Sequence, residues 1–144
     1  MIDIIKQLND KDDQKAYEFA KKIIIESAES DKYLEMIPEF SKMLESKSSF
    51  VRARGFMLIC HQAKWANNGQ IDSVFNQMLP LLNDTKPTVV RQCLTALKEV
   101  ILFRPEMTEQ IKKAITEINL NAYKDSMSSL IKKDIEELET IFGE

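Results

Sequence analysis

The sequence predicts an all-α protein built from repeated pairs of antiparallel helices. Only three glycines and four prolines occur among the 144 residues, too few to punctuate the many short strands of a β protein. Leu, Ile, Lys, Glu, Met and Ala dominate the composition, and all of them suit helices. Apolar residues recur with helical spacing, and one long stretch aligns with a later one. The length suits a single domain over residues 1–144 with one continuous core.

An internal repeat supports this architecture most directly. Residues 40–65 align with residues 78–103 at an offset of 38 without a gap. A further copy follows at an offset of 41, where Leu130 and Leu138 fall under Val89 and Leu97. Self-similarity at such a period is typical of helical-repeat proteins, in which each helix pair packs on the next. The apolar positions that coincide in the first alignment are Phe40 with Met78, Met43 with Leu81, Leu44 with Leu82, Val51 with Val89, Phe56 with Leu94, Ile59 with Leu97, Ala63 with Ile101 and Trp65 with Phe103.

The first two helix pairs occupy residues 1–30 and 31–66. The segment MIDIIKQL begins the first pair, and the periodic residues Tyr17, Ala20 and Ile24 form its second helix. In the second pair, apolar side chains recur with a period of roughly 3.6 residues, and a second helix follows from about Ser49. The periodic residues of that first helix are Leu34, Ile37, Met43 and Leu44.

The remaining two pairs occupy residues 70–104 and 105–143, after a turn at Asn67-Asn68-Gly69. Pro87 and Pro105 suit the first turns of helices, where a missing N–H does no harm. One polar residue precedes each second helix at an equivalent position, and its short side chain can accept the free N–H groups of a helix start. These residues are Asp10, Ser46, Asp84 and Asp125.

The segment LLNDTKPTVVRQCLTAL, residues 81–97, resembles the HEAT repeat. The matching residues are Asp84, Pro87, Val89, Leu94, Ala96 and Leu97. The resemblance extends in weaker form over nearly the whole chain. It implies a right-handed α-solenoid of the armadillo-like class, with the second helix of each pair on the concave side, and it implies no chemistry. Arg52 occupies the family's arginine position, but Val90 and Ile131 occupy it in the later units, so an unbroken Asp/Arg ladder is not implied.

Composition and charge argue against several functional classes. The net charge is −3 and the pI is about 5.3, whereas DNA-binding domains usually carry a strong basic face. The longest apolar runs, such as FMLIC at 56–60, are far shorter than the roughly 18 residues that span a membrane. The N-terminus carries acidic residues and does not read as a secretory signal, so we expect a cytoplasmic protein without membrane contact.

No motif for catalysis, metal or cofactor binding is present in the sequence. Cys60 and Cys93 lack CxxC spacing and fit apolar helix faces, so we expect reduced, buried thiols. His61 has no second histidine and no triad partner at a recognisable spacing. Trp65 aligns with Phe103 and is expected to close the end of a helix pair. We therefore expect neither an enzyme nor a site for a cofactor or a small-molecule substrate.

The leading hypothesis is a protein-interaction module that binds a peptide or helix of a partner on its concave surface. Arg52, Arg54 and Arg91 are the candidate anchors for an acidic partner, because arginine forks suit carboxylates. With Lys98 and Lys132 they could form a basic track along the second helices. The same residues could instead be solvated charges or salt bridges between repeats. Nucleic-acid binding, as in HEAT-like proteins that resemble DNA-alkylation repair glycosylases, is the alternative function.

Overall fold

The computed structural model describes residues 2–142, with side chains from residue 3, and every regular element in that range is helical. The prediction of an all-α protein is confirmed. The eight α-helices are α1 (Ile2–Leu8), α2 (Asp13–Ser27), α3 (Ile37–Met43), α4 (Ser49–Cys60), α5 (Asp72–Met78), α6 (Pro87–Phe103), α7 (Thr108–Thr116) and α8 (Asp125–Phe142). Four 3-10 helices adjoin them: η1 (Leu34–Met36), η2 (Leu79–Asn83), η3 (Pro105–Met107) and η4 (Leu120–Ala122). No described helix is long and apolar enough to cross a membrane.

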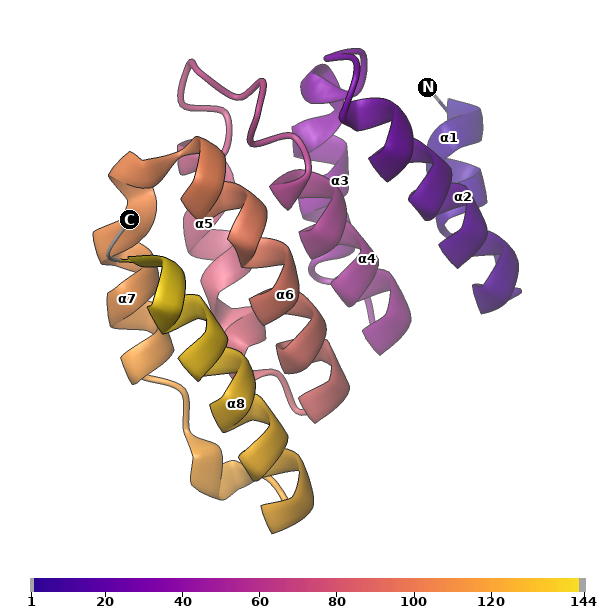
Figure 1. The fold of residues 1–144 in the computed structure, drawn as a ribbon. Helices are drawn as coiled ribbons and strands as arrows, with labels where there is room; N and C mark the ends of the chain where they lie inside the picture. Colours follow the sequence, from indigo (N-terminus) through magenta and orange to yellow (C-terminus); the bar gives the residue numbers. More distant parts are fainter. Residues whose placement is uncertain (1, 143–144) are drawn as a thin grey trace.

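The helices form two layers (Figure 1). In one layer α2, α4, α6 and α8 lie side by side in chain order, and α4 packs extensively on both α3 and α6. The other layer contains α1, α3, α5 and α7. We call α2, α4, α6 and α8 the second helices. A single hydrophobic cluster fills the space between the layers, with Phe40, Phe56 and Phe75 among its fully buried side chains.

The turns before three second helices share one hydrogen bond. Side-chain oxygens of Asp10, Ser46 and Asp84 each accept the N–H of the residue two positions later, at 2.8, 3.1 and 2.9 Å. The capping prediction therefore needs a correction, because these residues shape the turn and each helix starts three residues later. Asp12 and Ser48 instead cap the first-turn N–H groups of α2 and α4. Asp125, the fourth predicted equivalent, is already the first residue of α8.

Other turn predictions agree with the structure. Gly69 has a φ of 76°, the left-handed conformation that glycine adopts without steric cost. Pro87 is the first residue of α6, whereas Pro105 begins η3 rather than an α-helix.

Cys60 and Cys93 are free and buried, and burial raises the pKa of both thiols well above its ordinary value.

Gly55 permits a close approach between α4 and α3. A Cβ atom at this position would lie 2.7 Å from the Cβ of Met43 and 2.8 Å from the carbonyl oxygen of Phe40. Both atoms belong to α3, and neither can move without moving the helix backbone. The glycine therefore sets how tightly α4 packs on α3.

We predict that Gly55→Ala lowers the free energy of unfolding by about 1–2 kcal/mol, because overpacking outweighs the roughly 1 kcal/mol that alanine gains in helix propensity. Urea denaturation measures the change. Ser129→Ala, on the exposed side of α8, serves as control and should change stability by less than about 0.5 kcal/mol. A stability equal to or above that of the wild type would contradict the packing explanation.

Candidate binding surface

A trough runs along α4 between α2 and α6. It consists of three hollows of about 370, 540 and 380 Å³. The first two share Tyr17, Met57 and Gln92, and the second and third share His61 and Glu99, so the hollows are continuous. From Phe50 to His61 the floor covers three helical turns, roughly 16 Å. We call this surface the α4 trough; its apolar and charged lining residues are given below.

All four large apolar side chains that are exposed among the described residues line the α4 trough. Tyr17 on α2 is 40% exposed and Phe50 on α4 is 60% exposed, and both line the first hollow. Ile25 on α2 and Leu102 on α6 are 69% and 68% exposed, and both line the third hollow. Exposed apolar groups gathered in one place are typical of interaction sites, whereas scattered ones are not.

Arg54 ties the start of α2 to α4. Its Nη1 donates to the carbonyl oxygen of Leu8 at 2.7 Å, and its Nη2 donates to Oδ1 of Asp13 at 3.0 Å. The Arg54 side chain is only 3% exposed. The expectation that Arg54 anchors an acidic partner is therefore corrected, because its guanidinium faces the turn between α1 and α2 and is not presented at the surface.

The end of α2 is tied to the residues that follow α4. Nε2 of Gln62 donates to Oγ of Ser27 at 2.9 Å, and Nε1 of Trp65 donates to the carbonyl oxygen of Ser27 at 2.7 Å. Nζ of Lys64 donates to the carbonyl oxygen of Ala28 at 2.9 Å and lies over the ring of Trp65. Trp65 thus joins the ends of two consecutive helix pairs.

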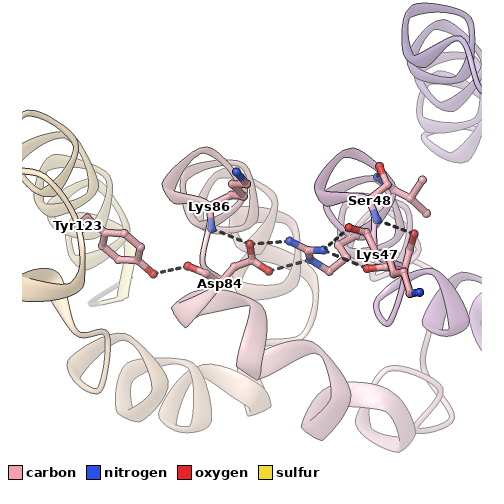
Figure 2. Close-up of polar contacts among 8 residues, drawn as sticks. Lys47, Ser48, Asp84, Lys86 and Tyr123 are labelled. Atoms are coloured by element: carbon pink, nitrogen blue, oxygen red, sulfur yellow. Dashed lines mark hydrogen bonds and ion pairs between the residues drawn. The ribbon is translucent and has the colours of Figure 1, made fainter.

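Arg52 and Asp84 form a bidentate ion pair between α4 and the turn before α6. Nε and Nη2 of Arg52 donate to the two carboxylate oxygens at 2.8 and 3.0 Å. The side chains are 16% and 8% exposed. Asp84 lies between Tyr123, whose hydroxyl donates to the Asp84 carbonyl oxygen, and the turn at Lys47 and Ser48 (Figure 2). The guanidinium group of Arg52 therefore has its hydrogen-bond partners within the fold.

The other members of the predicted basic track are also mostly paired. Arg91 donates two hydrogen bonds to Asp134 at 2.7 and 3.2 Å, which raise the pKa of Arg91, and Lys98 pairs with Glu137 at 3.1 Å. Lys132 is exposed on α8. Arg91 and Lys98 line the central hollow and Arg54 lines the first, whereas Arg52 and Lys132 line none of the three. Four of the five residues thus form salt bridges, as the alternative interpretation of these charges predicts. No continuous basic track links the five.

His61 and Glu99 lie at the junction of the central and third hollows. His61 follows the last residue of α4, and burial lowers the pKa of its imidazole. The negative charge of Glu99 acts in the opposite direction and raises that pKa. No group of three or more His, Cys, Asp or Glu side chains that could hold a metal ion occurs within the described part of the chain.

The exposed apolar residues of the trough are the part of the surface that sequence reasoning missed. Ile25 ends the run KIII and Leu102 lies in the run VILF. Consecutive apolar residues cannot all face one side of a helix, so at least one must point away from the main core. That signal identifies outward-facing residues without showing that they meet on one surface.

Comparison of the chain with protein-family models, curated proteins and solved structures finds no match.

We predict that His61 titrates below the ordinary histidine pKa of about 6.5 and that Glu99→Gln lowers its pKa further, because the substitution removes the charge that favours imidazolium. NMR titration of the imidazole ring measures both values, and His61 is the only histidine in the chain, so its signal needs no assignment. Glu139→Gln, on α8, should leave the pKa unchanged. An unchanged or higher His61 pKa in Glu99→Gln would contradict the electrostatic effect of Glu99.

Proposed function

We propose that the protein is a non-catalytic interaction module that binds a peptide or helix of a partner protein in the α4 trough. In this proposal the chain is a short α-solenoid of the HEAT-like kind, and the second helices form its concave side. The four helix pairs of the repeat correspond to α1–α2, α3–α4, α5–α6 and α7–α8. Solenoids of this type offer extended, rigid surfaces to partner chains without dedicated chemistry.

The observation that carries the proposal is the gathering of Tyr17, Ile25, Phe50 and Leu102 along one trough. Burying an exposed large apolar side chain contributes on the order of 1–2 kcal/mol, so a ligand that covers all four gains enough to offset part of its ordering entropy. The trough is lined by regular helices, which keep these side chains in fixed positions. A preorganised apolar surface of this kind favours binding because little flexibility is lost.

The pairing of the arginines weighs against an acidic ligand. Docking a carboxylate on the Nε–Nη2 edge of Arg52 or Arg91 would compete with Asp84 or Asp134, which already accepts two hydrogen bonds from that edge. The same pairing reduces the number of cations available to nucleic acid phosphates. Apolar burial, rather than charge, is therefore the main source of affinity in the proposal.

The proposal predicts that Phe50→Ser combined with Leu102→Ser abolishes capture of the binding partner while the helical content, measured by circular dichroism, stays unchanged. Both side chains are more than half exposed, so their loss should not unfold the protein. The experiment is affinity capture from the native lysate, with and without nuclease, followed by mass spectrometry. The matched control combines Asn76→Ala with Gln110→Ala, two exposed residues that border a hollow between η2 and α7.

A protein retained by the wild type and the control, but lost from the trough variant, is the expected result. Retention of every captured protein by the trough variant would place binding elsewhere. Partners that disappear on nuclease treatment would favour nucleic-acid binding instead.

A further inference from the structure

We infer that the ligand of the α4 trough is an amphipathic α-helix with apolar residues at both ends of a three-turn face and a lysine or arginine between them, opposite Glu99. This inference rests on the proposed function and specifies the chemistry of the partner. It also reverses the charge that the sequence alone favours, since the arginines predict an acidic partner.

The backbone of the trough favours a helical ligand over an extended one. The walls are α2 and α6, whose backbone N–H and C=O groups are bonded within the helices, so an extended chain would find no strand edge to pair with. A helix satisfies its own backbone groups and needs only side-chain contacts. Because α2 and α6 flank the floor formed by α4, a ligand helix of roughly 10 Å diameter can pack along α4 at the usual 8–10 Å between helix axes.

The distribution of apolar residues sets the spacing of the ligand's anchors. The first hollow offers Tyr17, Phe50 and Met57, and the third offers Ile24, Ile25, Leu102 and Phe103. The central hollow between them adds polar groups such as Gln92 and Thr95. A helix that rises about 1.5 Å per residue covers the roughly 16 Å between the two ends in eleven residues, and positions i and i+11 share a face.

The charges that line the trough determine which sign of charge the centre of the ligand helix should carry. Asp13, Arg91 and Lys98 each have an ion-pair partner, Arg54, Asp134 and Glu137 respectively. Glu99 lines the central and third hollows and, among the described residues, forms no ion pair or side-chain hydrogen bond. A docked helix would remove water from this carboxylate, which is costly unless the helix supplies a cation.

The position of Glu99 fixes where that cation should lie. Glu99 comes seven residues after Gln92 and three before Leu102 along α6. A ligand helix parallel to α6 would therefore carry its Lys or Arg at i+7, and an antiparallel one at i+4. Both positions share the face of i and i+11. Lys64, at the far end of the trough, disfavours a cation beyond the second anchor.

The test is selection of helix-forming 18-residue peptides from a display library on the full-length protein. Enriched peptides should carry apolar residues eleven positions apart with Lys or Arg between them. For a fluorescently labelled selected peptide, Phe50→Ser with Leu102→Ser should weaken binding at least tenfold, and Glu99→Gln should weaken it about five- to tenfold. Replacing the central Lys or Arg of the peptide by Gln should remove the effect of Glu99→Gln, and Glu35→Gln on η1 is the matched control.

The outcomes separate the inference from the proposed function. Suppose that the selected peptides respond to the Phe50 and Leu102 substitutions. The inference is still overturned if these peptides lack a central cation, bind without forming a helix, or bind Glu99→Gln as tightly as the wild type. In each of these cases the proposed function stands. Enriched peptides that ignore the Phe50 and Leu102 substitutions, or a selection that enriches no peptide, would count against both.

Discussion

Two arginines on α4 tie this helix to the starts of α2 and α6, its neighbours in the layer of second helices. Arg52 reaches forward to Asp84 before α6, and Arg54 reaches back to Leu8 at the end of α1 and Asp13 at the start of α2. Both guanidinium groups are largely removed from water, so each must be fully paired to avoid a desolvation penalty. Such pairs add little net stability over apolar packing, but breaking one of them costs several kcal/mol. Their main effect is therefore to fix how the neighbouring helices lie relative to α4.

The α4 trough follows from this arrangement. Polar contacts hold both ends of α2, through Arg54 of α4 at its start and through Gln62 and Trp65, which follow α4, at its end. Between these ends, the buried residues of α2 are mostly small, with Ala16 and Ala20 facing the core, whereas Tyr17 faces the trough. The row of helices thus leaves an apolar hollow along α4 that its own side chains do not fill. A helix from another protein would complete the packing that the second helices begin.

The sequence predicts the fold better than it predicts the binding surface. The apolar periodicity and the repeat at residues 40–65 and 78–103 identify the helices because helix formation and core packing depend on local spacing. The ion pairs could not be read in this way, since Arg52 and Asp84 are 32 residues apart and Arg54 and Asp13 are 41 apart. From the sequence alone, an arginine on a second helix appears free to bind a partner protein. In the fold, the next or the preceding helix pair supplies its carboxylate partner. The runs KIII and VILF do indicate outward-facing apolar residues. Only the packing of α2 and α6 around α4 places these residues in the same trough.

Amide hydrogen exchange of the Arg54→Leu variant tests most directly whether the arginines of α4 fix the second helices. The substitution removes both contacts from α4 to the turn before α2 and leaves the Arg52–Asp84 pair in place. If the account is right, amides of α1 and α2 exchange about tenfold faster or more, while those of α6 and α8 keep their protection. Unchanged exchange in α2, or an equal loss of protection throughout the chain, would contradict it.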